Sequence, residues 1–186
     1  MRHSRPRVLI SSAALRRRVR VLGREIGRSC RGRTPLLIGI LKGSFVFMAD
    51  LVRALDGPCD CDFLRVSSYG RGISPSGRLR IGPGPFVPLR GRHVVVVEDI
   101  ADSGRTLRAV LARLRRGRPA SLRVCVLLDK PSRRTHPVPI DFTGFRIPDM
   151  FVVGYGLDHD GRWRGLPYIG VVGSTSNVTR TRTQRA

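Results

Sequence analysis

The feature that most constrains the fold is an alternation of short apolar runs with stretches of helical periodicity. Apolar runs at 35–41 and 94–97, and the segment SLRVCVLLD at 121–129, are typical of strands that are buried on both faces. Apolar side chains also recur every three or four residues over 13–27, before the first of these segments, and over 44–55, after it, as on one face of an amphipathic helix. This rhythm predicts an α/β fold with a mainly parallel central sheet flanked by helices, in which ligands bind at the carboxyl ends of the strands.

Further elements complete this pattern. Residues 61–68 and 168–172 have the composition of strands, and apolar positions from Leu107 onward predict a third helix that ends near Gly117. Residues 151–158, FVVGYGLD, precede the last strand and follow a stretch rich in Pro and Thr.

Two segments do not follow the alternation. From Tyr69 the composition shifts to Gly, Pro, Ser and Arg, with a short RLRI inside, which predicts a long mobile loop or a loose hairpin over about 68–91. The tail 173–186 shows no apolar period, and we expect it to be disordered. The chain is therefore expected to form a single domain over 1–172.

Composition limits the class of protein. A chain of 186 residues with 41% hydrophobic residues can bury a core, and no apolar run approaches the ~18 residues of a membrane span. The basic N-terminus lacks an apolar segment of signal-peptide length, so the expected location is cytoplasmic, without a membrane. The cysteines fit reduced thiols there, since no CxxC or zinc-finger spacing occurs among Cys30, Cys59, Cys61 and Cys125.

The net charge of +22, from 35 basic against 13 acidic residues, raises the question of a polyanionic partner. The basic residues are 33 arginines spread along the whole chain, without interleaved aromatic residues, and the only lysines are Lys42 and Lys130. A compositional bias toward arginine is the simpler explanation, and nucleic acid is not the expected partner. A regulatory or nucleic-acid-binding protein built on the same fold remains the alternative function.

A strand, a turn and a helix are expected to meet in VVVVEDIADSGRTL, residues 94–107. The start of a helix offers unpaired backbone N–H groups and the positive end of the helix dipole, which together bind anions. Gly104 lets the backbone approach a ligand closely, and the hydroxyls of Ser103 and Thr106 can donate to a phosphate. Neither GxxxxGK[ST] nor GxGxxG occurs, so this small cradle suits one terminal monophosphate.

The same stretch carries three carboxylates. Glu98 and Asp99 cannot serve the phosphate because like charges repel, but they can accept hydrogen bonds from a ribose diol or hold Mg²⁺ through water. Asp102 lies further on and can reach past the sugar, so the stretch predicts a ribose 5-phosphate site with a base nearby. The alternative, that Asp102 and Ser103 only cap the helix, accounts for one acid rather than three.

Residues 94–107 closely resemble the phosphoribosyl pyrophosphate motif of type I phosphoribosyltransferases. Other segments resemble the hypoxanthine-guanine branch of that family in its order: ILKGSFVFMADL, VSSYG, LLDKPSRR, GFRIPDMFVVGYGLD and LPYIGVV. The resemblance covers nearly the whole chain and implies the type I phosphoribosyltransferase fold, with a small hood made by N- and C-terminal segments. It also implies a purine-salvage enzyme, usually a homodimer or homotetramer. Such enzymes transfer 5-phosphoribosyl from phosphoribosyl pyrophosphate to N9 of a 6-oxopurine and release pyrophosphate, with Mg²⁺ present.

The resemblance assigns residues to both substrates. The positions that it places at phosphoribosyl pyrophosphate are Lys42, Gly43, Glu98, Asp99, Ser103, Gly104, Arg105, Thr106 and Arg164. Those that it places at the purine are Asp102 as general base or acid at N7, Lys130 at the 6-oxo group, Phe151 stacked on the base, the Val152 backbone, and Asp158. It places the metal near Glu98, Asp99 and Asp158, expects a cis bond at Leu41–Lys42, and has Ser68 and Tyr69 begin a loop that closes over the reacting centre.

The chain departs from the family's pattern at a few of these positions. Ser103 stands where threonine is common, Arg105 where lysine is common, and His159 where an aromatic residue is usual. Residues 82–91 are richer in proline than expected. The two lysines support the resemblance. A chain that uses arginine 33 times has lysine only at 42 and 130, the two positions where the family needs a compact ammonium.

Overall fold

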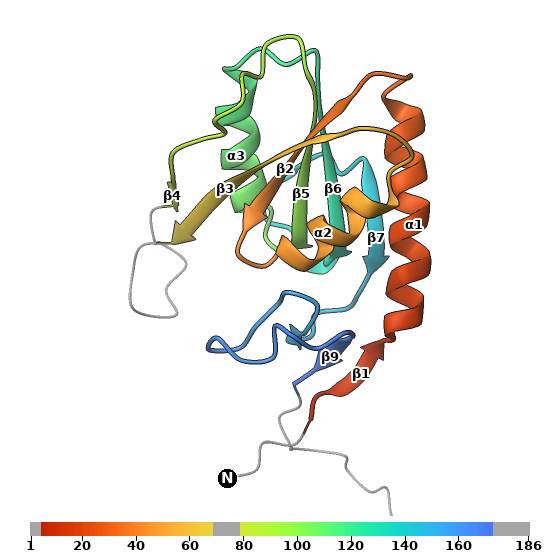
Figure 1. Cartoon of the computed structure of the whole chain (residues 1–186). Helices are drawn as coiled ribbons and strands as arrows, with labels where there is room; N and C mark the ends of the chain where they lie inside the picture. The colour runs from red at the N-terminus through yellow and green to blue at the C-terminus, as the bar shows by residue number, and fades with distance from the viewer. Residues whose placement is uncertain (1–4, 69–78, 173–186) are drawn as a thin grey trace, which may run out of the picture.

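The computed structural model describes residues 5–68 and 79–172, and its main element is a six-stranded sheet (Figure 1). The neighbours in the sheet are parallel except for the pair β3–β4 at one edge. In sheet order the strands are β4 (Leu79–Ile81), β3 (Asp60–Ser68), β2 (Pro35–Leu41), β5 (His93–Ala101), β6 (Ser121–Asp129) and β7 (Phe142–Arg146). The predicted mainly parallel sheet is confirmed.

Helices cover both faces of this sheet, as expected. They are α1 (Ser12–Ser29), α2 (Phe45–Ala54) and α3 (Arg105–Arg115), with a short 3-10 helix η1 (Pro131–Arg133) after β6. The valines of β5 alternate between two cores because successive side chains of a strand point to opposite faces. Val95 and Val97 pack with α1 and α2, whereas Val94 and Val96 pack with α3.

A second, three-stranded sheet forms the hood. It contains β1 (Arg7–Ile10), β9 (Ile169–Val171) and β8 (Val152–Val153), all antiparallel. In Figure 1 this hood lies beyond the edge to which the arrowheads of the parallel strands point. The N- and C-terminal parts of the chain therefore meet over the carboxyl ends of the main sheet, where ligands of such folds bind.

The segment after β3 is a hairpin in its described part. Strand β4 pairs with β3 from Val66↔Ile81 to Ser68↔Leu79. The proline-rich residues that follow are held to the sheet, since Asp62 accepts hydrogen bonds from the backbone N–H groups of Phe86 and Val87. Of the loop predicted over about 68–91, residues 69–78 lie outside the described residues, as does the tail 173–186, so the mobility and disorder predicted there stay predictions.

Candidate active site

The acidic pair at the end of β5 is buried. Glu98 and Asp99 are each only 7% exposed, and Oε2 of Glu98 is buried without a hydrogen-bond partner. Burial, the neighbouring Asp99 charge and the hydrogen bond between the two carboxyls raise the pKa of Glu98 well above its ordinary value. Burial also raises the pKa of Asp99, against the hydrogen bond from Glu98 and the positive charge of Arg164. A solvated acidic pair is therefore excluded, and the pair is prepared to accept a cation or hydroxyl donors.

Gly43 brings three segments together around this pair. It follows the cis peptide Leu41–Lys42 at the end of β2, where the expected cis bond is found. A Cβ on Gly43 would lie 1.7 Å from Oδ2 of Asp99, and a Cβ on Gly156 would lie 2.1 Å from the carbonyl oxygen of Gly43. The turn after β2 thus packs between the acidic pair and the hood, with Lys42 exposed beside it.

The predicted phosphate cradle is a pocket of about 240 Å³ beside the acidic pair. It is lined by Glu98, Ile100, Ala101, Asp102, Ser103, Gly104, Thr106 and Leu107. Helix α3 begins later than the sequence suggests, with Gly104 as its N-cap in the left-handed region at φ 83°. Asp102 therefore does not cap the helix, although Ser103 Oγ accepts a hydrogen bond from the Arg105 backbone at 3.4 Å.

On the other side of this turn a chain of charges connects Asp102 to Lys130. Arg133 Nε lies 3.2 Å from Oδ1 of Asp102, and its Nη1 lies 3.5 Å from Oδ2 of Asp149. Asp149 Oδ1 is in turn 3.7 Å from Nζ of Lys130, which is only 6% exposed. The hydrogen bond to Asp102 and the two carboxylate charges raise the pKa of Arg133. Lys130 is thus a buried ammonium rather than a solvated surface residue, and Asp149 and Arg133 link it to Asp102.

The hood contributes the remaining predicted residues. Phe151 is 53% exposed and meets the His159 ring edge to face, with centroids 4.9 Å apart, so His159 supplies an aromatic contact despite its departure from the family's pattern. The stretch 151–158 is strand only at Val152–Val153, because Gly154, Tyr155 and Gly156 turn the chain with positive φ.

Arg164 is held within the hood loop by two neighbouring groups. Its guanidinium pairs with Asp158 and donates to the carbonyl oxygen of Gly156 at 2.6 Å. Asp158 also accepts a hydrogen bond from the Gly161 backbone at 2.7 Å. Because the Arg164 charge also acts on Asp99, the structure brings hood and sheet residues into one site.

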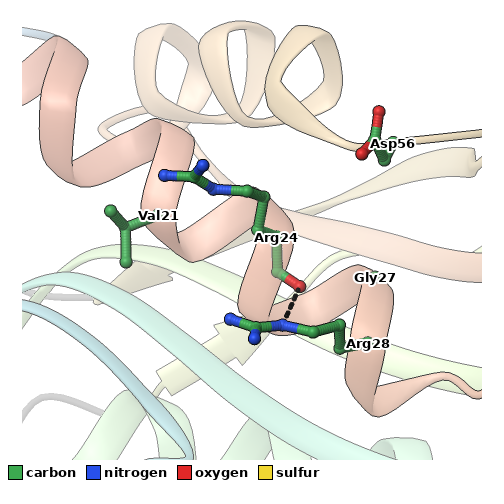
Figure 2. A pocket seen from close by; sticks show the side chains of 5 residues that line it. All are labelled: Val21, Arg24, Gly27, Arg28 and Asp56. Atoms are coloured by element: carbon green, nitrogen blue, oxygen red, sulfur yellow. Dashed lines mark hydrogen bonds between the residues drawn. The ribbon is translucent and has the colours of Figure 1, made fainter.

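The predicted closing loop begins at Ser68, and one larger cavity stands apart from this site. Ser68 ends β3, and Tyr69 lies outside the described residues. A cavity of about 470 Å³ lies on the outer side of α1 and near the loop after α2 (Figure 2). Arg24 and Arg28 line it, and Arg28 Nε donates to the Arg24 carbonyl oxygen. This cavity contains none of the predicted site residues, so its size does not make it the reaction site.

The buried acid predicts a specific pH dependence of stability. Because the folded chain holds the Glu98 proton more tightly than the unfolded chain, this stabilisation is complete below the ordinary value of 4.5 and is lost as pH rises through the raised pKa. We expect Glu98→Gln, which cannot ionise, to melt about 2–4 °C above the wild type at pH 8, as a change of ~1 kcal/mol does in a chain of this size. Thermal unfolding in chelator from pH 4 to pH 9 measures the difference. Equal midpoints across that range would contradict the prediction.

Comparison with known proteins agrees with this geometry. A model of the phosphoribosyl transferase domain matches residues 11–160. The hypoxanthine phosphoribosyltransferase of Salmonella typhimurium is 47% identical over 167 residues, which are 89% of this chain and 94% of that protein. The hypoxanthine-guanine phosphoribosyltransferase of Bacillus subtilis is 43% identical over 172 residues, or 92% of this chain and 96% of that protein.

Solved structures show the same likeness in three dimensions. A crystal structure of a hypoxanthine-guanine phosphoribosyltransferase from Bacillus anthracis matches with a TM-score of 0.85 and 40% identity, covering 89% of this chain and 98% of that one. The domain match, the identity over most of both chains and the shared fold agree with one another. The chain therefore belongs to the phosphoribosyltransferase family, within its hypoxanthine-guanine branch, whose members are transferases.

Proposed function

We propose that this protein transfers the 5-phosphoribosyl group from phosphoribosyl pyrophosphate to N9 of hypoxanthine or guanine, giving IMP or GMP and pyrophosphate. The observation that carries the proposal is the convergence of three groups at one edge of the sheet. A small pocket at a helix start, a buried acidic pair and a buried ammonium are the complements of a phosphate, a ribose with its metal, and a 6-oxopurine. Purine salvage, a class that the relatives share, is the setting for this reaction.

The chain's own residues bind and orient the phosphoribosyl donor. Ser103, Gly104, Arg105 and Thr106 hold the 5-phosphate at the start of α3, where backbone N–H groups and the helix dipole favour an anion. Lys42 and Arg164 provide positive charge for the pyrophosphate as it leaves. Charge that develops in the transition state is stabilised best by donors that are already in place, and Arg164 is held there by Asp158 and Gly156.

Mg²⁺ is the metal that we assign to this reaction, and the acidic pair fits it. Among residues 5–68 and 79–172 no group of three or more His, Cys, Asp or Glu side chains could hold a metal ion alone. Mg²⁺ commonly binds one or two carboxylates and takes its other ligands from substrate phosphates and water. Glu98 and Asp99 would hold it with the ribose diol, and Asp158 would lie near a second ion. When bound, Mg²⁺ neutralises the charge on the departing pyrophosphate.

The purine is oriented by the hood and by β6. Phe151 offers an exposed ring on which a base can stack, and the Val152 backbone and Asp158 read its edge. The Lys130 ammonium has donors and no acceptor, so it favours a 6-oxo group and disfavours the 6-amino group of adenine. Asp102 then exchanges the proton at N7 of the purine, within the pocket it shares with the phosphate cradle.

Three further features of the proposal concern the whole molecule. The chain would form one domain over 1–172. A loop that begins at Ser68 and Tyr69 would close over the reacting centre and exclude water from the reaction. The cytoplasm is the proposed location, and the four free cysteines suit its reducing conditions. A homodimer or homotetramer is the proposed assembly. None of the described helices is long and apolar enough to cross a membrane.

An assay of the purified protein tests the proposal directly. The protein is incubated with phosphoribosyl pyrophosphate, Mg²⁺ and, in turn, hypoxanthine, guanine, xanthine or adenine, and the nucleotide is measured. IMP or GMP should form and AMP should not. If no base gives a nucleotide, the proposed function is wrong.

Replacing Lys130 by arginine tests the choice of purine. The broad planar guanidinium does not fit a buried position that holds a compact ammonium 3.7 Å from Asp149. We expect the KM for hypoxanthine and guanine to rise by about tenfold or more, with little change in the KM for phosphoribosyl pyrophosphate. Arg146→Lys, at a position whose side chain is 79% exposed, is the matched control. Normal guanine kinetics in the Lys130 variant would contradict this role.

A further inference from the structure

The segment that follows Lys130 donates hydrogen bonds to the backbone of the loop that carries Asp102. We call residues 133–136 the support segment. The backbone N–H groups of Thr135 and His136 donate to the carbonyl oxygen of Ser103 at 3.2 and 2.9 Å. The contact is close, since a Cβ on Gly104 would lie 2.3 Å from the carbonyl oxygen of His136. The phosphate cradle therefore rests on a part of the chain that contains no predicted phosphate ligand.

Arg134 contributes most to this support. Its Nε donates to the carbonyl oxygen of Asp102 and its Nη2 to that of Ala101, both at 3.1 Å. Its guanidinium also pairs with the buried carboxylate of Asp129 at the end of β6. This ion pair fixes the orientation of the guanidinium group. The Arg134 side chain is only 15% exposed, and it links the end of β6 to the turn after β5.

The direction of these carbonyl groups decides where the opposite N–H groups point. In a planar trans peptide the C=O and the N–H of the next residue point in opposite directions. The carbonyl oxygens of Ala101, Asp102 and Ser103 all accept hydrogen bonds from residues 130–136. The N–H groups of Asp102, Ser103 and Gly104 consequently point away from the support segment. That is the orientation needed to bind a phosphate in the pocket that these residues line.

The neighbouring arginine acts on the side chain of the same aspartate. Arg133 Nε contacts Oδ1 of Asp102 at 3.2 Å and Nη1 contacts Asp149 at 3.5 Å, so the Asp102 carboxylate is held at one of its two oxygens. Both partners are about half exposed, which leaves room for the carboxylate to meet a base. Two successive residues thus contact the two halves of Asp102, one the backbone and the other the carboxylate.

We propose that Arg133 and Arg134 are positioning residues for phosphoribosyl transfer, with Arg134 orienting the phosphate cradle and Arg133 orienting the Asp102 carboxylate toward the purine. The inference rests on the proposed function and adds to it two residues with different positioning roles. Because both arginines follow Lys130 closely in the chain, the segment that reads the 6-oxo group also aligns the phosphate cradle.

The two roles predict different kinetic signatures. Arg134→Gln is expected to raise the KM for phosphoribosyl pyrophosphate and lower kcat/KM for it by about 100-fold, because a small displacement of the cradle is enough for such a loss. Arg133→Gln is expected to lower kcat by about tenfold while that KM stays within about twofold of wild type. Arg134→Lys should recover part of the loss, since an ammonium can reach one carbonyl oxygen but not all three acceptors.

Controls separate positioning from stability and from the proposed function. Arg146→Gln removes the other, more distant partner of Asp129 and should leave both constants unchanged. If Arg134→Gln does not fold because Asp129 becomes an unpaired buried charge, Asp129→Asn/Arg134→Gln replaces the pair with neutral amides and should show the same loss. Calorimetric binding of phosphoribosyl pyrophosphate with Mg²⁺, without purine, gives a readout that is independent of turnover.

The outcomes are distinct. A wild type that neither binds phosphoribosyl pyrophosphate nor forms nucleotide would overturn the proposed function itself. An active wild type, with Arg134→Gln and its double variant equal to Arg146→Gln in kcat and KM, would overturn the role of Arg134. If Arg133→Gln keeps wild-type kcat, or changes only the unfolding temperature, the role of Arg133 is wrong.

Discussion

Asp102→Asn is expected to lower turnover with hypoxanthine by about 10²- to 10⁴-fold, the usual contribution of a positioned acid or base. Asparagine has nearly the same shape and keeps the backbone carbonyl that Arg134 holds at 3.1 Å, so the phosphate cradle is preserved. The amide cannot exchange a proton at N7, whereas its oxygen can still accept a hydrogen bond from Arg133, so the loss falls mainly on the chemistry. Nucleotide formation gives kcat, and calorimetry should find binding of phosphoribosyl pyrophosphate within about threefold of wild type.

Asp160→Asn is the matched control for this substitution. The Asp160 side chain is 90% exposed in the hood, and asparagine tolerates its left-handed backbone at φ 51°. This variant should keep wild-type turnover. Unchanged turnover in Asp102→Asn would remove Asp102 from its proposed role, and an equal loss of donor binding would show that the carboxylate supports the cradle instead.

The centre of the fold could be predicted from the sequence because its strands are buried on both faces. Strand β2 occupies Pro35–Leu41 and β6 occupies Ser121–Asp129, as the apolar runs predict. Parallel strands end at one edge, so residues just after these runs are brought together, which agrees with the assignment of Lys42, Glu98 and Lys130 to one site that the family resemblance implies.

Two edge strands, β7 and β1, were missed because they are not buried on both faces. Strand β7 at Phe142–Arg146 is only partly buried and follows a stretch rich in Pro and Thr. Strand β1 at Arg7–Ile10 is short and mostly exposed, and it exists because β9 pairs with it. Edge strands receive their order from tertiary pairing rather than from local hydrophobicity, so no periodic signal marks them.

The supporting residues of the site were missed because their role depends on contacts across the fold. Arg133 and Arg134 stand in LLDKPSRR among 33 arginines, and composition gives no reason to choose them. Their adjacency just after Lys130, at the end of a predicted strand, was the available signal. The burial of Lys130 and the contact between Phe151 and His159 also needed the third dimension.

Gly43→Ala is expected to abolish most activity and to destabilise the fold, although it adds a single methyl group. The new Cβ would lie 1.7 Å from Oδ2 and 2.4 Å from Cγ of Asp99, whose carboxylate is buried. The turn cannot retreat freely, because the Gly43 carbonyl oxygen already lies against Gly156 on the hood side. Either the acidic pair or the turn with Lys42 must move. Such a displacement lowers kcat/KM by about 100-fold or more, and overpacking typically costs about 1–3 kcal/mol in the free energy of unfolding.

Gly27→Ala provides the matched control, because it makes the same chemical change where nothing lies within 4 Å of the new Cβ. Gly27 lies in the last turns of α1, so alanine should leave kcat/KM unchanged and stabilise the helix by about 0.5–1 kcal/mol. Steady-state kinetics and urea unfolding of both variants measure the contrast. Wild-type kinetics in Gly43→Ala would mean that the turn after β2 yields without disturbing the acidic pair, and that the two do not form one rigid site.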